Sequence, residues 1–447
     1  MDELFAILHI KNERNRMLRN NILLSGILKA IALLTSLIIV PITINYLDDE
    51  VYGIWLTISS MLFWINTFDI GLGNGMRNYL TKAVSTKNFE MGRVYVSTTF
   101  ILLSFLALLI AFILIPVYTL NFNSVFNTVQ VNNATLRNSL MIAVGFTLIN
   151  LITKNIGFIF VAFQKYALND FINTLGSVLG LAIICILSFS CKGNLLYITL
   201  AFTGSQTLVY LLSMFLVFHK YPELKPGFKF FNWKIGKQVI GKGIGFFIIQ
   251  ITSCLVIFGA SNFFITQFCG PKDVTVYNIA YKYFNLLIIA YSIIISPMWN
   301  AYTDAYVKGD IKWIKTTFNK ALKIWGASIL FGAIMLALSN TFYNLWIGHA
   351  VIVPLSVSLC VMIYVTLFNL NNCLTYLING INKICIQIIT SVIITAIYII
   401  TILILGKRLG IVGIVGCMAT SYAIMAAIHY YQCTLIINNK ATGIWNK

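Results

Sequence analysis

Four charged side chains lie inside long apolar stretches of this 447-residue sequence, and they are the strongest candidates for chemistry. Three are lysines, Lys29, Lys154 and Lys282, and the fourth is a carboxylate, Asp69. A charge at mid-span costs about 2.5–3.5 kcal/mol on insertion scales, so such residues usually face a protein interior or a wet cavity. Three cations against one anion predict a positive cavity. Lysine acts there as a compact point charge, which suits a phosphate or pyrophosphate ligand.

The alternative for each lysine is to extend its ammonium group along the apolar surface to the membrane–water boundary. Lys29 and Lys282 lie about a third of the way into their apolar stretches, where this extension is feasible. Lys154 is more central, so the cavity is the better interpretation for it. Both interpretations stay open for Lys29 and Lys282.

The stretch Phe68–Ala83 combines Asp69 with Arg77 and is rich in glycine. No strand precedes it and it lies at a membrane edge, so we do not interpret it as a phosphate-binding loop. Its glycines are expected to allow close packing or local unwinding at the inner end of a span. Asp69 could then pair with Arg77, carry a coupling proton or cation, or be solvated at the membrane edge. Arg77 would lie at the cytoplasmic mouth.

The composition predicts an all-α polytopic membrane protein, because 59% of the residues are hydrophobic and only 10% are charged. Apolar runs of about twenty residues recur along the chain, and each can cross the hydrocarbon core. We count about twelve such spans, with the seventh at about residues 243–268 and a turn after the ninth at about residues 339–353. The net charge of +18 comes mostly from basic residues on the side that holds the N-terminus. The positive-inside rule therefore predicts that both termini are cytoplasmic, and it disfavours nucleic acid as a partner.

Neither a metal nor another cofactor is expected from the cysteines and histidines. The nine cysteines include no C-x-x-C pair and the four histidines are scattered, so no ligand cluster is indicated. His429 lies in the last apolar run and could carry a proton. A histidine that is hydrogen-bonded by a neighbouring helix is the better interpretation.

A basic stretch at residues 219–242 divides the chain near its midpoint and predicts a cytoplasmic linker between residues 1–218 and 243–447. The two halves share a pattern: Asn78-x-x-Thr81-x-Ala83 recurs in the second half as Asn300-x-x-Thr303-x-Ala305. Six spans in each half give both halves the same orientation. This predicts two pseudo-symmetric six-helix lobes that rock in alternating access, although chance similarity between two cytoplasmic loops is the alternative.

The run from Asp69 to Asn78, together with Tyr52-Gly53-Ile54-Trp55, resembles the N-terminal signature of Wzx-type flippases. Pro297-x-Trp299 and the segment from Asp304 to Ile314 are similar to the second half of that family. These are O-antigen and related oligosaccharide translocases of the polysaccharide-transport branch of the multidrug/oligosaccharidyl-lipid/polysaccharide (MOP) exporter superfamily. The resemblance implies a MATE-like fold of two six-helix lobes.

The resemblance also implies a non-enzymatic transporter of the bacterial inner membrane that serves lipopolysaccharide biosynthesis. Its substrate would be an undecaprenyl-pyrophosphate-linked oligosaccharide, with a proton or sodium gradient as the driving force. A polysaccharide polymerase and a chain-length regulator would be its protein partners. Lys29 and Lys282 fall in the helices where relatives place cavity cations, often arginine. Asp69 and Asp304 would serve in coupling or gating.

Two other functions were weighed. A drug exporter of the same superfamily would need carboxylates for cationic drugs, whereas the interior predicted here is positive. A membrane-embedded polysaccharide polymerase or glycosyltransferase would need acidic residues, arginine or histidine on a sizeable loop. The longest outer loop, residues 119–137, contains no carboxylate and no histidine.

Overall fold

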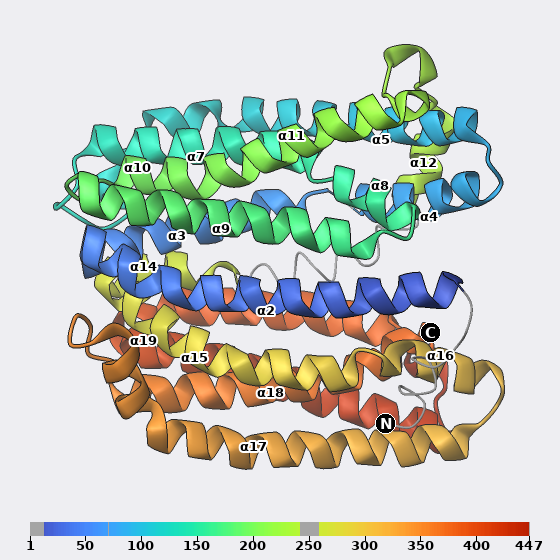
Figure 1. Ribbon diagram of the computed structural model, residues 1–447. Helices are drawn as coiled ribbons and strands as arrows, with labels where there is room; N and C mark the ends of the chain where they lie inside the picture. Colours follow the sequence, from blue (N-terminus) through green and yellow to red (C-terminus); the bar gives the residue numbers. More distant parts are fainter. Residues whose placement is uncertain (1–12, 70, 242–258, 447) are drawn as a thin grey trace. The chain divides into compact units, whose positions relative to one another are not determined.

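The computed structural model describes residues 13–69, 71–241 and 259–446, and within these ranges every regular element is helical (Figure 1). Among the described residues, nine helical segments are long and apolar enough to cross a membrane, or ten if the bent pair α3 and α4 forms one span. The predicted all-helical polytopic fold is confirmed.

The elements of the chain before the undescribed residues 242–258 begin with the long helix α2. They are α2 (Glu13–Leu47), α3 (Asp49–Thr67), α4 (Leu72–Ser85), α5 (Phe89–Leu114), η1 (Ile115–Thr119), α6 (Phe122–Val125), α7 (Asn133–Thr153), α8 (Ile156–Ala162), α9 (Tyr166–Ser190), α10 (Leu195–Thr199), the π-helical η2 (Leu200–Gly204), α11 (Ser205–Lys220), η3 (Pro222–Leu224), η4 (Phe228–Phe230) and α12 (Trp233–Gly241).

The elements that follow are α14 (Ser261–Cys269), α15 (Pro271–Ile295), α16 (Met298–Val307), α17 (Ile311–Ile347), α18 (Leu355–Gly380), α19 (Cys385–Ile437) and η6 (Gly443–Asn446).

Helix α19 accounts for two of the predicted spans. It contains 53 residues, which at about 1.5 Å per residue is more than twice the thickness of a hydrocarbon core. Gly410 interrupts it with a non-helical conformation at φ 62°. The predicted seventh span, residues 243–268, falls largely on residues outside the described ranges. One expectation was wrong: the turn predicted from residue 339 begins only after Ile347, because α17 continues that far.

The described chain forms two units, each with its own core. The first comprises Met1–Asp48, Leu62–Val125 and Val129–Phe247, and the second comprises Asp49–Met61, Phe126–Thr128 and Ile248–Lys447. The predicted division into residues 1–218, 219–242 and 243–447 stays a prediction. The largest buried cores are built from apolar residues of several helices: Met76, Leu80, Val96, Phe100 and Ile156 in the first unit, and Tyr302, Phe318, Leu374, Leu377 and Cys433 in the second.

Backbone turns recur at the spacing that the sequence repeat predicts, which is the offset from Asn78 to Asn300. Asp48 has a left-handed φ of 78°, and Gly270, the position at this offset, has a φ of 103°. Both residues directly precede a helix, α3 and α15. Lys87 and Gly309 form a second pair at the same offset, with φ of 56° and 73°.

The helix caps follow the same spacing. Asn88 precedes α5 and its side chain accepts a hydrogen bond from the Met91 backbone N–H. Asp310, which lies at the repeat offset from Asn88, precedes α17 and accepts from the Trp313 backbone N–H in the same way. At these paired positions the backbone geometry repeats between the two halves, even though the residue types differ.

Candidate functional site

Lys154 joins two helix breaks in the first unit. It lies between α7 and α8, and its Nζ donates a 2.6 Å hydrogen bond to the backbone carbonyl oxygen of Asn66, in the last turn of α3. The same Nζ is 3.6 Å from Oδ2 of Asp69, and the two side chains are 22% and 18% exposed. The ammonium group therefore satisfies a carbonyl that the end of α3 leaves open and neutralises the carboxylate beside it.

The sequence around Asp69 ends one helix and starts another. The Asp69 side-chain Oδ1 accepts a 3.1 Å hydrogen bond from the Gly71 backbone N–H, a local bond that competes with helix formation. Gly71 has a left-handed φ of 70°, which glycine adopts without steric cost, and α4 begins directly after it. Asp69 thus has two structural roles, since it turns the chain and faces Lys154.

Gly73 brings α4 into close contact with α8. A Cβ at this position would collide with the Phe158 ring and with Oδ1 of Asn155. The expectation that this glycine-rich stretch allows close packing is confirmed at Gly73. A larger residue there would push α4 away from α8.

Several buried polar atoms accompany this ion pair. Asn155 is fully buried, and its Nδ2 donates a 2.8 Å hydrogen bond to the Leu151 carbonyl oxygen. Its Oδ1 has no hydrogen-bond partner among the described residues, and the same holds for Trp64 Nε1 and Asn150 Oδ1. A buried polar atom without a partner costs about 1–3 kcal/mol. We place the centre of the candidate site at the Asp69–Lys154 pair because both of its charged side chains are largely buried.

Arg77 does not pair with Asp69. Its Nε and Nη2 donate to Oδ1 of the neighbouring Asn78, at 3.3 and 3.2 Å. Of the three alternatives for Asp69, the pair with Arg77 is not formed, because Lys154 reaches the carboxylate from the break between α7 and α8. Arg77 is half-buried in α4, and its predicted place at the cytoplasmic mouth stays a prediction.

Lys29 and Lys282 occupy different units. Lys29 is exposed on α2, and Lys282 is half-buried on α15. Asn278 and Asn285 share the helix face of Lys282, at spacings of four and three residues. The Tyr281 hydroxyl donates to Oδ1 of Asn285 at 3.2 Å. This face of α15 offers an ammonium, amides and a phenol, the groups that hydrogen-bond a hydroxylated anionic ligand.

Asp304 lies on the surface of α16. Its Oδ2 is 2.7 Å from the Nζ of Lys308, one helical turn on, and both side chains are largely exposed. This is the geometry of an ordinary surface ion pair, which adds little stability. The predicted coupling or gating role of Asp304 stays a prediction.

His429 is fully buried and hydrogen-bonded at both ring nitrogens. Its Nδ1 is 2.8 Å from Oδ1 of Asn371 on α18, and its Nε2 is 3.0 Å from Oγ1 of Thr390. The interpretation that a neighbouring helix satisfies this histidine is confirmed. Sequence reasoning missed both partners, although an asparagine such as Asn371 inside an apolar run is itself a signal.

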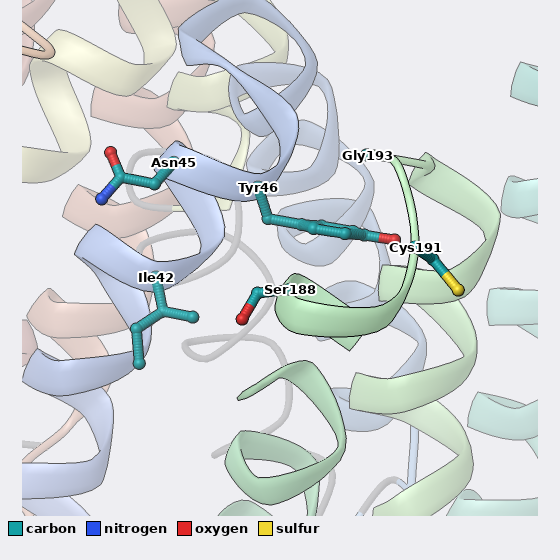
Figure 2. A pocket seen from close by; sticks show the side chains of 6 residues that line it. All are labelled: Ile42, Asn45, Tyr46, Ser188, Cys191 and Gly193. Carbon is teal, nitrogen blue, oxygen red and sulfur yellow. The ribbon is translucent and has the colours of Figure 1, made fainter. Parts of the chain in front are cut away.

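A cavity of about 360 Å³ lies where α2 and α9 end in the first unit (Figure 2). Its lining contains none of the predicted site residues; it consists of Ile42, Asn45, Tyr46, Ser188, Cys191 and Gly193. Figure 2 shows Tyr46 extending from α2 toward Cys191 and Gly193, and its hydroxyl donates to the Lys192 carbonyl oxygen at 3.0 Å. The cavity has no charged side chain in its lining, so it does not match the expected cationic site.

No family model matches the sequence. The chain is 23% identical over 315 residues to the "Putative O-antigen export protein" of Yersinia pseudotuberculosis, and the match covers 67% of each protein.

Solved structures of transporters share the fold. An inward-facing multidrug resistance MATE family transporter of the MOP superfamily superimposes with a TM-score of 0.77 at 15% identity, over 92% of this chain and 95% of that one. A MOP superfamily transporter from Pyrococcus furiosus, described as having a binding pocket of reverse polarity, gives 0.58 at 14% identity over 93% and 97%. The chain therefore has the fold of MATE transporters, and its described residues contain nine or ten candidate membrane-spanning helices.

Proposed function

We propose that this protein flips an undecaprenyl-pyrophosphate-linked oligosaccharide, such as an O-antigen repeat unit, across the bacterial inner membrane. The direction is from the cytoplasmic to the periplasmic leaflet, by alternating access. The transporter fold and the similarity to a protein named for O-antigen export support this proposal. The substrate class rests on the charge of the membrane-embedded residues.

The observation that carries the proposal is that Asp69 lies beside a basic residue, Lys154. This carboxylate, the only one predicted deep in an apolar run, lies 3.6 Å from Lys154. It is therefore already engaged by a basic side chain, and Lys29 and Lys282 are further lysines on membrane-spanning helices, one in each unit. Lysine can approach the phosphate oxygens of a pyrophosphate from many directions, so each is a candidate contact for that group.

Each candidate residue takes a distinct role in this proposal. Lys29 and Lys282 attract the pyrophosphate, and Arg77 meets it first at the cytoplasmic mouth. The amides and phenol beside Lys282 hydrogen-bond the sugars, while the lipid tail stays in the bilayer. Lys154 acts as a positioning residue that holds the break between α3 and α4. A proton or sodium ion that binds Asp69 would release Lys154 and so couple the gradient to this break.

A complementation experiment tests the proposal. The gene is deleted in its host and replaced by a Lys29→Gln/Lys282→Gln double variant. We expect loss of surface polysaccharide and accumulation of lipid-linked repeat units on the cytoplasmic side, at unchanged protein level. The matched control is Lys192→Gln/Lys407→Gln, which neutralises one exposed lysine of each unit and should complement normally.

Normal polysaccharide in the Lys29→Gln/Lys282→Gln strain would overturn the cationic-site assignment. If deletion instead raised drug sensitivity and left the polysaccharide intact, the drug-exporter alternative would be correct.

A further inference from the structure

The segment between α11 and the end of α12 folds back onto the first unit (Figure 1). The Gly227 backbone N–H donates to Ser97 Oγ, and the Asn232 backbone N–H donates to Thr98 Oγ1, each at 3.1 Å. Ser97 and Thr98 lie near the N-terminal end of α5. Residues 225–238, called the linker segment below, are thus fixed by backbone hydrogen bonds to a membrane-spanning helix.

One side of the linker segment packs against the core of the first unit. Leu224, just before the linker segment, is fully buried, and Ile235 packs on the cluster around Leu103. The Arg93 guanidinium lies 4.0 Å from the centre of the Phe230 ring and donates to the Lys225 carbonyl oxygen at 2.9 Å. These contacts set which side chains point outward.

The other side is aromatic and basic. Phe228 is 87% exposed and Trp233 is 53% exposed. Phe231 is exposed as well, and Lys237 Nζ lies 6.0 Å from the Trp233 ring centre. The lysines of the segment are also exposed: Lys225, Lys229, Lys234 and Lys237. Aromatic residues interleaved with lysine are typical of segments that lie in the interface of an anionic membrane.

The place where the linker segment contacts α5 indicates that its exposed side chains face the membrane. Thr98, Phe105 and Phe112 follow one another at seven-residue intervals, so they share one face of α5. Phe105 and Phe112 are exposed, as expected for a face that contacts lipid. The linker segment covers the same face at Thr98, where this lipid-facing stripe approaches the end of the helix. The exposed aromatic residues thus adjoin a helix face whose exposed phenylalanines are expected to contact lipid.

We infer that the linker segment is an interfacial anchor that binds anionic phospholipid headgroups. Phe228, Phe231 and Trp233 insert at the headgroup level of the leaflet nearest the N-terminal end of α5, and the lysines contact the lipid phosphates. The inference is independent of the proposed substrate. Each lysine near an anionic surface should raise lipid affinity by about fivefold.

The test uses the full-length protein in nanodiscs of phosphatidylglycerol or of phosphatidylcholine. Hydrogen–deuterium exchange of residues 225–238 should be slower in phosphatidylglycerol. The variant Lys229→Gln/Lys234→Gln/Lys237→Gln should abolish this difference and retain fewer phosphatidylglycerol molecules in native mass spectrometry. The control Lys312→Gln/Lys315→Gln/Lys320→Gln removes three exposed lysines of α17 and should behave like the unmodified protein.

A second variant, Phe228→Ser/Trp233→Ser, checks the aromatic contribution. Both side chains are largely exposed, so we expect normal folding together with faster exchange in both lipids. Equal exchange in the two lipids for the unmodified protein would overturn the inference. The inference would also be overturned if the α17 control variant lost as many phosphatidylglycerol molecules as the variant of the linker segment. If soluble pyrophosphate at constant ionic strength removed the protection, the surface would be a substrate site instead of a lipid anchor.

Discussion

In each half of the molecule a short helix follows the helix of the second span, but the two junctions are secured differently. In the first half, α3 gives way to α4, and a charged side chain, Lys154, holds the junction. In the second half, α15 gives way to α16 at Pro297, and the contacts there are neutral. The Thr303 hydroxyl donates to the Gly380 carbonyl oxygen at 2.7 Å.

Packing at Gly380 reinforces the second junction. A Cβ on Gly380 would lie 2.8 Å from the Trp299 backbone oxygen and 3.1 Å from the Tyr302 Cβ. A junction held by close backbone packing has no group that an ion can neutralise. A junction held by a lysine and a carboxylate can be altered by binding one proton or one cation. On the proposed function, we therefore expect the first junction to respond to ion binding and the second to stay rigid.

The largest expected effect comes from Lys154→Met. It leaves the Asp69 carboxylate without its cation and the Asn66 carbonyl without its donor. Because both charged side chains are about one-fifth exposed, we expect a loss of about 3 kcal/mol in stability, at the lower end for a buried pair. Thermal unfolding of the purified protein in detergent measures this loss. The double variant Lys154→Met/Asp69→Asn should recover most of it, and failure to recover would show that the charge pair is not what holds the junction.

Gly380→Ala should cost about 2 kcal/mol, because the Trp299 backbone oxygen cannot move aside as a flexible side chain can. Gly326→Ala in α17 is the matched control. Nothing lies within 4 Å of its Cβ position, so alanine should stabilise this helix by about 0.5–1 kcal/mol. The same thermal unfolding assay compares the two variants. If Gly380→Ala left the stability unchanged, the second junction would not be held by packing.

Asp69→Asn should cost only about 1 kcal/mol, because Lys154 keeps its hydrogen bond to the Asn66 carbonyl. Its effect should appear in coupling. Substrate flipping in proteoliposomes should continue but lose its response to an imposed proton or sodium gradient. A variant that still responds to both gradients would remove Asp69 from coupling and leave it a structural role alone.

Asp304→Asn should have the smallest effect on stability, about 0.3–0.5 kcal/mol, since its partner Lys308 is exposed one helical turn away. Any loss of flipping in this variant therefore reports the gating role predicted from the sequence. Lys308→Gln breaks the same ion pair and keeps the carboxylate. Equal losses in both variants would assign the effect to the ion pair and not to Asp304.

Sequence patterns sufficed for the fold and singled out Asp69 and Lys154, but they did not predict the contacts between them. Hydropathy predicted the helices, and the isolation of Asp69 in an apolar run marked it as important. The choice of Lys154 over Arg77 as its neighbour depends on packing between residues far apart in the chain. The hydrogen bond from Lys154 to a backbone carbonyl could not be predicted either, since every residue has one.

The end of α17 shows the same limit. Residues 339–347 are more polar than the span before them, which predicted a turn. Ser339 and Tyr343 are nevertheless buried, and the Tyr343 hydroxyl is hydrogen-bonded to Ser358 Oγ on α18 at 3.0 Å. Hydropathy counts these side chains as polar because it does not include the neighbour that satisfies them.

Two pairs of turns are relevant to how distantly related proteins of this fold are aligned. The pairs are Asp48 with Gly270 and Lys87 with Gly309. Each pair keeps a positive φ while the residue type changes. At about 15% identity, residue matching leaves helix registers ambiguous, because most apolar residues can substitute for one another. Positions with a positive φ are sparse and sterically demanding, so they can serve as fixed points for alignment. Ancestral duplication then becomes traceable through dihedral angles after the sequence identity has decayed.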